Sequence, residues 1–326
     1  MSIELVHQNF SASLNKGLIS SKSITNIKKI KGDASSRKYF RVTTDNSTYI
    51  VCLCDQKAFS SFTLLQKVFK EKGIPVPKIF DQDIEGGYLL QEDLGEGTLL
   101  DFLTDADETE EFKIYKKVLD SLANLQKVDV SATPSKASFD KDGLLFEINL
   151  TREYFVEKYL KYNWEEGELD LFEDNFRSLC EQASSGVFVL NHRDFHARNI
   201  MLRSDDPIFI DFQDARAGIA QYDLASLLDD CYYQITLSNV EKLKRYYFDK
   251  YIPGSEFSKF LKDYDLISIQ RLFKAVGTFA RIYVVRGDDS YLKYIDRSWN
   301  KLINRLGPYP EYKKLQMLLL KIKNGN

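Results

Sequence analysis

The segment at residues 189–202 reads VLNHRDFHARNIML. It contains the pattern H-R-D-x-x-x-x-N, in which Asp194 precedes Asn199 by five residues. A second apolar run ends in Ile210-Asp211-Phe212, so that Asp211 follows Asn199 by twelve residues. The apolar flanks predict short β-strands joined by a polar loop. Such a strand-loop-strand arrangement would bring Asp194, Asn199 and Asp211 to one edge of a hairpin.

These three residue types suit phosphoryl transfer, which requires few protein groups. A carboxylate near the acceptor hydroxyl orients it and takes its proton, while oxygen ligands hold Mg²⁺ on the phosphates. Asp194 fits the first role, and Asn199 and Asp211 fit the second. We therefore predict a kinase that uses ATP and Mg²⁺, with Asp194, Asn199 and Asp211 as its catalytic residues.

Simpler interpretations exist for the same residues taken singly. An isolated Asp in a loop is more often a turn former or a helix cap than a catalytic group. His192 and His196 could be zinc ligands, but no third His or Cys with suitable spacing lies nearby. We interpret His192 as a structural residue that fixes the loop, and we assign no role to His196.

Composition and charge limit the class of protein. The chain has 326 residues, of which 44% are hydrophobic, and 45 Lys+Arg against 48 Asp+Glu give a net charge of -3. This apolar fraction excludes global disorder, and the length fits two domains or one two-lobed unit. A mildly acidic chain is not typical of nucleic-acid-binding proteins, which carry a basic face. We therefore expect no nucleic-acid partner.

The sequence also predicts where in the cell the protein is found. The first 17 residues, MSIELVHQNFSASLNKG, lack the apolar core of a signal peptide, and no apolar stretch approaches the ~18 residues of a membrane span. The four cysteines are few and irregularly spaced. We expect reduced cysteines in a cytoplasmic protein without a membrane partner. The sequence does not predict an oligomeric state.

Hydrophobic periodicity divides the chain into a first part rich in predicted strands and a second part rich in predicted helices. Strands are predicted at 26–31, 38–44, 47–54 and 86–94, with a helix at 57–73 and an extended piece at 74–80. Further helices are predicted at 108–128, 144–161, 168–183, 221–235, 238–251, 260–285 and 290–305, interrupted by a β region at 187–211. This layout predicts an α+β, protein-kinase-like two-lobed fold. Its N-lobe, residues 1–94, would hold a small antiparallel sheet, and its C-lobe, residues 95–326, would be mainly helical.

Several segments resemble a known family. HRDFHARNIM (192–201) followed by FIDFQDARAGIAQYDLASLL (209–228) resembles the aminoglycoside/choline phosphotransferase branch of the kinase-like superfamily. GDASSRKYFRV (32–42), YLLQEDLG (88–95) and FARIYVVRG (279–287) narrow the resemblance to bacterial kinases that phosphorylate N-acetylmuramate and N-acetylglucosamine at C1. The resemblance covers about residues 28–310. It implies transfer of the γ-phosphoryl group of ATP to the anomeric hydroxyl of a small-molecule sugar, in cell-wall sugar recycling.

The resemblance also places the nucleotide. The loop between the first two strands would cover the phosphates, as the corresponding loop of kinases does. Its residues are Gly32, Asp33, Ala34, Ser35, Ser36 and Arg37. Glu92 and Leu94 end the strand that links the lobes, where backbone groups of such folds hold the adenine edge. An ordinary hairpin turn is the alternative interpretation of the loop.

The third strand departs from the pattern of protein kinases. It reads YIVCLC (49–54) and lacks the Lys that grips the α- and β-phosphates in protein kinases. Positive charge must therefore come from elsewhere, and Arg37 is our choice over Lys38, Arg41 and Lys57. The missing Lys also leaves open a catalytically inactive, nucleotide-binding scaffold.

The acceptor site is less clearly marked. Asp214 and Arg216 follow the predicted metal ligand and could reach sugar hydroxyls or a lactyl carboxylate, or form a surface ion pair. The resemblance places Glu147 and Asn149 on a helix that lines the acceptor site. Residues two apart cannot share one face of a helix, so at most one of them faces inward. An aminoglycoside, choline or another alcohol is the alternative acceptor.

Overall fold

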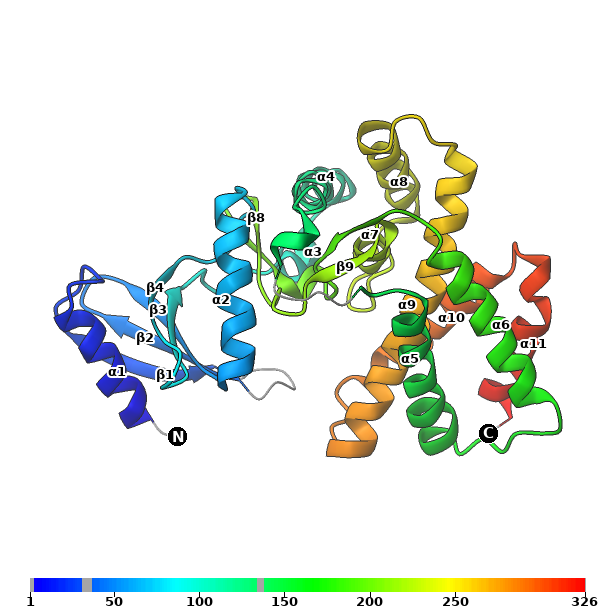
Figure 1. The fold of residues 1–326 in the computed structure, drawn as a ribbon, viewed down its shortest axis with the longest axis horizontal. Helices are drawn as coiled ribbons and strands as arrows, with labels where there is room; N and C mark the ends of the chain where they lie inside the picture. The colour runs from blue at the N-terminus through cyan, green and yellow to red at the C-terminus, as the bar shows by residue number, and fades with distance from the viewer. Residues whose placement is uncertain (1–2, 31–36, 134–137, 326) are drawn as a thin grey trace.

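A computed structural model describes residues 3–30, 37–133 and 138–325 of the chain. Figure 1 shows a β-sheet at one end of the molecule and a helical part at the other, with helix α2 (Gln56–Glu71) between them. The five strands of the sheet are antiparallel and lie in the order β1-β2-β3-β5-β4. They are β1 (Ile24–Ile30), β2 (Lys38–Thr44), β3 (Thr48–Leu53), β4 (Ile79–Asp83) and β5 (Tyr88–Glu92).

The two faces of the sheet have different partners, as the alternation of side chains along β2 shows. Phe40 and Val42 belong to a buried cluster with residues of helix α1 (Ile3–Asn15). Tyr39 and Arg41, which point to the opposite face, line a cleft between the sheet and the helical part. One face of the sheet therefore forms a core, and the other forms a wall of the cleft.

Helix α2 connects the sheet to the helical part. The apolar residues that predicted it recur at three- and four-residue spacing and are all buried: Phe59, Phe62, Leu65 and Phe69. The rings of Phe62 and Phe69 pack on Phe212, with centroids 4.6 and 5.2 Å apart. Because Phe212 directly follows Asp211, this packing fixes the backbone beside a predicted metal ligand.

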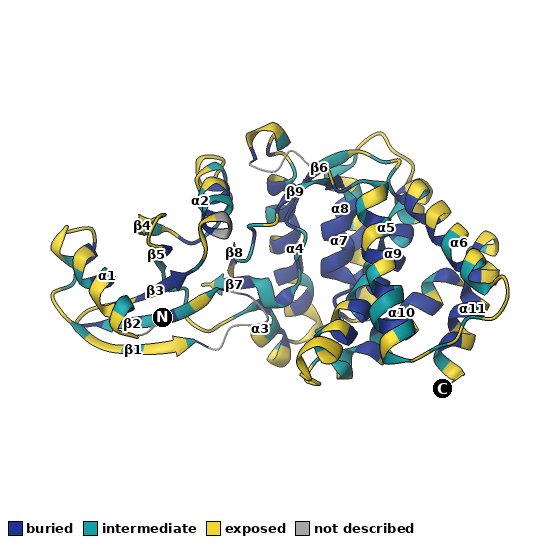
Figure 2. Cartoon of the chain, turned by 60° about the horizontal axis from the view of Figure 1, so that its bottom comes forward, coloured by how far each residue is buried: buried dark blue, intermediate teal, exposed yellow. Residues whose placement is uncertain are grey.

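The helical part is built around one long central helix, α9. Its helices are α3 (Leu99–Asp105), α4 (Glu108–Leu125), α5 (Lys141–Thr151), α6 (Glu168–Ala183), α7 (Gln221–Leu228), α8 (Leu237–Tyr251), α9 (Phe257–Arg286), α10 (Ile295–Leu306) and α11 (Lys313–Asn324). Helix α9 packs against α5, α6, α7 and α10. In Figure 2 the buried residues concentrate in α4, α7 and α9. No helix within the described ranges is both long enough and apolar enough to cross a membrane.

The predicted fold class is confirmed, but the short β region differs from the prediction. A hairpin does form, from β7 (Ile200–Arg203) and β8 (Asp206–Phe209). The preceding strand β6 (Phe188–Asn191) pairs instead with β9 (Arg216–Ile219), a strand that the sequence did not predict. Helices α1, α3 and α11 were also not predicted.

Candidate active site

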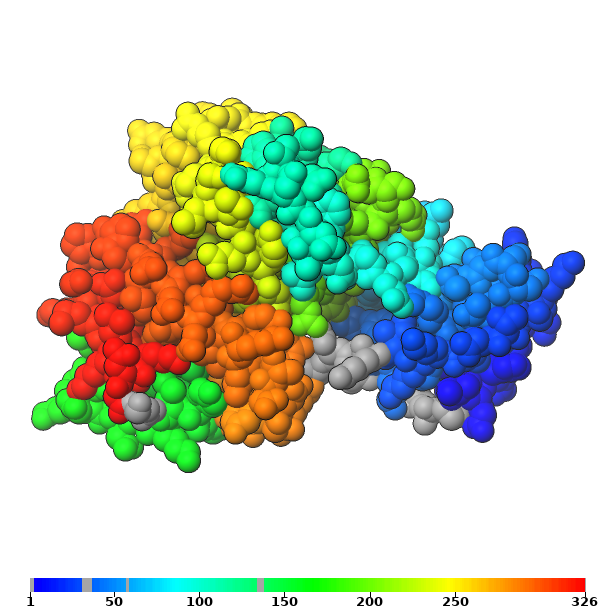
Figure 3. Space-filling view, turned by 180° about the vertical axis from the view of Figure 1, so that it is seen from behind, coloured from blue at the N-terminus to red at the C-terminus, as the bar shows by residue number. Residues whose placement is uncertain are grey.

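A cleft of about 1110 Å³ lies between the sheet and the helical part. Figure 3 shows the hollow between the sheet, in blue, and the end of α9, in orange. Its walls come from β1, β2, β3 and β5, from the segment that follows β5, from the loops around β7 and β8, and from the end of α9. Asp194, Asn199 and Asp211 all line it. The cleft is large enough for a nucleotide together with a small acceptor.

The loop that carries Asp194 is held from behind by buried polar groups. The backbone N–H groups of His192 and Arg193 donate to the carboxylate of Asp223, at 2.5 and 3.0 Å. Asp223 is fully buried in the first turn of α7. The ring of His192 lies with Nε2 3.0 Å from the carbonyl oxygen of Ile210. These contacts tie the Asp194 loop to the strand end that precedes Asp211.

Two residues beside the site have unusual backbone conformations. Arg193 has φ 78° and Asp211 has φ 63°, both in the left-handed region. This conformation costs a residue other than glycine about 1–3 kcal/mol, and it persists only where the surroundings enforce it. The buried bonds around Arg193 and the packing of Phe212 supply that constraint.

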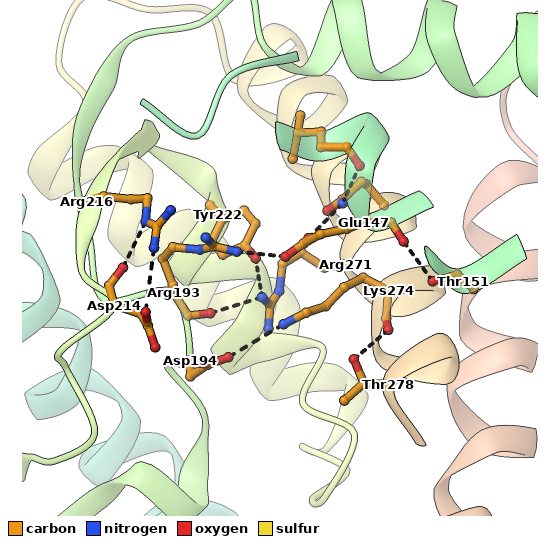
Figure 4. Close-up of polar contacts among 12 residues, drawn as sticks. Glu147, Thr151, Arg193, Asp194, Asp214, Arg216, Tyr222, Arg271, Lys274 and Thr278 are labelled. Atoms are coloured by element: carbon orange, nitrogen blue, oxygen red, sulfur yellow. Dashed lines mark hydrogen bonds and ion pairs between the residues drawn. The ribbon is translucent and has the colours of Figure 1, made fainter. Parts of the chain in front are cut away.

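Asp194 is half-buried, and a cation from α9 faces its carboxylate. The Nζ of Lys274 lies 3.6 Å from its Oδ1. Arg271, one turn earlier on the same helix, donates to the carbonyl oxygen of Arg193 at 3.0 Å and to the hydroxyl of Tyr222 at 2.6 Å (Figure 4). Burial raises the pKa of Asp194, but nearby positive charges, Lys274 foremost, outweigh burial and hold that pKa below its ordinary value. The carboxylate is therefore ionised at neutral pH.

Lys274 and Arg271 were not predicted as site residues. The signal that could have found them is two cations three residues apart within RLFKAVGTFA, a strongly apolar part of a predicted helix. Cations in such surroundings are rarely buried without a partner. Their partners lie on the Asp194 loop, which is distant in the sequence.

Asn199 follows Asp194 on a short helical turn, Ala197–Asn199. The side-chain Nδ2 of Asn199 donates to the backbone carbonyl oxygen of Asp194 at 2.9 Å. The backbone carbonyl oxygen of Asn199 accepts a hydrogen bond from the backbone N–H of Ile210 at 3.1 Å. No hydrogen bond within the described ranges reaches its Oδ1. Asn199 thus has an amide oxygen to offer to a metal ion beside both carboxylates.

Asp211 is paired with Arg37, which directly precedes β2. The guanidinium donates to Oδ1 of Asp211 at 2.5 Å and to Oε1 of Gln213 at 2.7 Å. Gln213 in turn donates to the same Asp211 oxygen at 3.2 Å. The Arg37 side chain is only 11% exposed. The other predicted phosphate-loop residues, Gly32, Asp33, Ala34, Ser35 and Ser36, lie outside the described residues.

These residues fit Mg²⁺ bound to a nucleotide. Mg²⁺ prefers oxygen ligands and is usually held by one or two carboxylates together with substrate phosphates. The carboxylate of Asp211 is already paired with a positively charged group, the guanidinium of Arg37. The side-chain amide of Asn199 supplies a second oxygen near this carboxylate. The described ranges contain no group of three or more His, Cys, Asp or Glu side chains placed to hold a metal ion. His192, one of the two histidines considered as zinc ligands, has its ring Nε2 3.0 Å from the carbonyl oxygen of Ile210.

The two residues predicted on the adenine side both line the cleft. The Glu92 carboxylate is 2.8 Å from the guanidinium of Arg203 and accepts from the N–H of Lys78 at 3.2 Å. The backbone N–H of Glu92 donates to the carbonyl oxygen of Lys78. The carboxylate and the backbone N–H of Glu92 therefore both have protein partners. For this reason Leu94 is better placed than Glu92 to contact a nucleotide.

The four residues predicted on the acceptor side occupy different environments, and Figure 4 shows three of them, Glu147, Asp214 and Arg216. Asp214 lines the cleft and lies 3.5 Å from Arg216, which is not among the described residues that line it. Glu147 is buried behind the loop, where Arg193 and Gln270 donate to its carboxylate at 2.7 and 3.0 Å. Asn149 is exposed on the opposite side of α5. The structure therefore brings Asp214 to the cleft and turns Asn149 away from it.

Comparisons with known proteins agree with this geometry. Residues 26–261 match the sequence model that describes the phosphotransferase enzyme family. An N-acetylmuramate/N-acetylglucosamine kinase of Neisseria meningitidis serogroup B is 31% identical over 299 residues, which cover 89% of this chain and 88% of that protein. A protein of the same name from Pseudomonas aeruginosa is also 31% identical, over 90% of this chain and 87% of its own length.

Solved structures share the fold at low sequence identity. An ADP-bound aminoglycoside phosphotransferase superposes with a TM-score of 0.63 at 17% identity, covering 93% of this chain and 97% of its own. A choline kinase from Streptococcus pneumoniae superposes with a TM-score of 0.65 at 16% identity, covering 92% and 98%. The family match spans the sheet, the Asp194 loop and Asp211. The chain belongs to the phosphotransferase enzyme family and has its protein-kinase-like fold.

Proposed function

We propose that this protein transfers the γ-phosphoryl group of ATP to the anomeric hydroxyl of N-acetylmuramate or N-acetylglucosamine, as a cytoplasmic step in the recycling of cell-wall sugars. The observation that carries the proposal is the convergence of Asp194, Asn199 and Asp211 on one cleft. The names of the relatives at 31% identity support the choice of acceptor.

The nucleotide is proposed to bind between an N-lobe of residues 1–94 and a C-lobe of residues 95–326. The loop from Gly32 to Arg37 would cover the phosphates, and the segment from Glu92 to Leu94 would hold the adenine. Asn199 and Asp211 would hold Mg²⁺. When bound, Mg²⁺ neutralises charge on the phosphates.

Asp194 acts on the acceptor. Its ionised carboxylate accepts a hydrogen bond from the C1 hydroxyl and takes the proton as the new P–O bond forms and the bond to the ADP oxygen breaks. A hemiacetal hydroxyl is more acidic than an ordinary alcohol, so a carboxylate with a low pKa suffices as the base. Lys274 holds this carboxylate in place through their ion pair.

The other acceptor-side residues take different parts in the proposal. Asp214 contacts the sugar directly, because it lines the cleft. Arg216 acts through its ion pair with Asp214, and Glu147 acts through Arg193 by fixing the catalytic loop. Asn149, which is exposed, has no part in it.

Arg37 supplies the positive charge that the third strand lacks. We expect Arg37→Gln to raise the KM for ATP by about 10–100-fold, since a charge-assisted hydrogen bond contributes about 1.5–3 kcal/mol. The exposed neighbour Lys38 provides the matched control, because Lys38→Gln removes a charge outside the cleft lining. Calorimetry with a non-hydrolysable ATP analogue separates binding from turnover. An unchanged affinity in Arg37→Gln would show that Arg37 does not contact the phosphates.

An ADP-release assay tests the proposed function as a whole. Mg-ATP is supplied with N-acetylmuramate, N-acetylglucosamine, an aminoglycoside or choline, and Asp194→Asn serves as the blank. We expect turnover with the N-acetylated sugars. Turnover with the antibiotic or choline alone would retain the chemistry and refute the acceptor, whereas ATP binding without turnover on any of the four would favour a scaffold.

A further inference from the structure

Two described residues in the lining of the cleft carry a buried polar atom that has no hydrogen-bond partner within the described ranges: Oε1 of Gln91 and Nδ1 of His196. His196 belongs to the catalytic loop, two residues after Asp194. Gln91 lies on the sheet side of the cleft, in β5, and the proposed mechanism gives it no role. Because a buried amide oxygen without a partner costs free energy, Gln91 requires an explanation.

The register of the sheet points Gln91 into the cleft. Gln91 lies directly opposite Ile50 of β3, which also lines the cleft. Since partners in an antiparallel pair share a face, both side chains lie on the cleft-facing side of the sheet. The next residue, Glu92, begins the segment proposed to hold the adenine. The terminal torsion of a glutamine is soft, so the amide can turn its oxygen toward a ligand in the cleft.

Apolar side chains line the same cleft. Besides Ile50, they come from α2, from the segment before β4, from β7 and from the segment after β8: Phe62, Pro77, Met201 and Ile210. Pro77 is near Gln91, because the residues that follow each of them are joined by a hydrogen bond of 2.8 Å from the N–H of Glu92 to the carbonyl oxygen of Lys78. A purine base has two apolar faces and a polar edge, so it suits apolar walls that carry a hydrogen-bonding side chain.

The charged groups on this side of the cleft are already engaged. The carboxylate of Asp93 accepts from Nε and Nη2 of Arg41 at 2.7 and 3.1 Å, and Arg41 also donates to Glu96. Glu92 pairs with Arg203 at 2.8 Å. The remaining charged residues of the sheet side are exposed or assigned to the phosphates: Lys28, Lys29, Asp101 and Arg37. A neutral base is therefore recognised here by hydrogen bonds rather than by charge.

We propose that Oε1 of Gln91 accepts a hydrogen bond from the exocyclic amino group of adenine, so that the protein selects ATP over nucleotides with a carbonyl oxygen at position 6 of the purine. The inference rests on the proposed function and makes it more specific. The amino group is a donor and gives the unpartnered oxygen its hydrogen bond. A carbonyl oxygen at the same position is an acceptor, so both oxygens would remain unpaired. A site whose buried polar group is left unpaired by a ligand discriminates strongly against that ligand.

Binding of ADP and IDP tests the proposal without turnover and without an acceptor. The two nucleotides differ in the base alone, where ADP carries the amino group and IDP carries a carbonyl oxygen. We expect the wild type to bind ADP more tightly than IDP in calorimetry. Gln91→Met keeps the length of the side chain and removes the amide, and it should lower the preference for ADP about 5–100-fold. An unchanged preference in this variant would refute the proposal.

A second variant determines which atom of the amide reads the base. The glutamine amide can also turn its N–H groups to the base, where they would donate to N1 of adenine or to the carbonyl oxygen of IDP. Gln91→Glu replaces the amide with an ionised carboxylate, which only accepts hydrogen bonds. We expect this variant to keep the preference for ADP. Loss or reversal of the preference would assign the contact to the N–H groups and overturn the proposal.

Gln82 offers a matched control. It is exposed on β4 of the same sheet and is not among the described residues that line the cleft. Gln82→Met makes the same chemical change outside the cleft and should leave the preference for ADP unchanged. A loss of preference equal to that of Gln91→Met would contradict the proposal. Thermal unfolding shows whether each variant folds, and Gln91→Glu decides the matter if Gln91→Met does not.

Two further results distinguish this proposal from the proposed function. If Gln91→Met weakens the binding of ADP and IDP by the same factor, Gln91 shapes the pocket without reading the base, and the proposal fails while the kinase activity stands. If the wild type phosphorylates no acceptor, the proposed function fails. The comparison of ADP with IDP then still tests Gln91, and equal binding of the two nucleotides, or binding of neither, overturns its role.

Discussion

Asp194→Asn is expected to lower kcat about 10²–10⁴-fold, the usual contribution of a general base. The amide keeps the shape of the side chain but can no longer take the proton of the acceptor hydroxyl. It also removes the negative partner of Lys274, which lies 3.6 Å away. The affinity for the ATP analogue should change by less than about twofold, since Asp194 is assigned to the acceptor. Steady-state turnover and calorimetry measure the two quantities separately.

A matched control for this variant lies in the same region of the chain. Asp206 is exposed at the start of β8 and pairs only loosely, at 3.5 Å, with the exposed Lys117. Asp206→Asn should leave both turnover and nucleotide affinity unchanged, because exposed ion pairs contribute little. If Asp194→Asn retained near-normal kcat, the assigned base would be wrong.

Asp211→Asn is expected to lower kcat/KM for Mg-ATP by about 10²–10³-fold, because a bound metal ion supplies several kcal/mol of charge stabilisation in the transition state. The amide is a weaker ligand for Mg²⁺ and no longer neutralises Arg37. The fold should survive, since Asn, like Asp, tolerates the left-handed conformation at this position.

A readout independent of turnover makes the Asp211 prediction sharper. Mn²⁺ binding can be followed by electron paramagnetic resonance in the presence of the ATP analogue. We expect weaker Mn²⁺ binding in Asp211→Asn and unchanged binding in Asp214→Asn, because Asp214 pairs with Arg216 and is assigned to the acceptor. Mn²⁺ affinity that is equal in wild type and Asp211→Asn would remove Asp211 from the metal site.

Local patterns were enough to predict most of the fold. Strands β1, β2, β3 and β5 and helix α2 follow from alternation and from three- and four-residue spacing, which depend only on near neighbours in the sequence. Strand β4 (Ile79–Asp83) was expected only as part of an extended piece at 74–80. Strand β9 was missed because Arg216–Ile219 is four residues long and pairs with a strand whose residues lie about 28 positions earlier. No local signal marks such a pairing.

Local sequence patterns also predicted only part of the candidate active site. The positions of Asp194, Asn199 and Asp211 follow from one motif and one short hairpin. Lys274 and Arg271 reach that loop from α9, and the Arg271 bond spans 78 residues. Glu147 carries a carboxylate on the predicted helix, but only the packed structure shows that Arg193 and Gln270 hold it behind the loop.

The position of the phosphate on the product tests the central claim most directly. The wild-type protein is incubated with Mg-ATP and N-acetylmuramate, and the product is examined by ³¹P and ¹H nuclear magnetic resonance. Transfer to the anomeric hydroxyl predicts coupling between the anomeric proton and phosphorus, together with loss of the reducing end. A product that keeps a free reducing end and carries the phosphate on another hydroxyl would contradict the account.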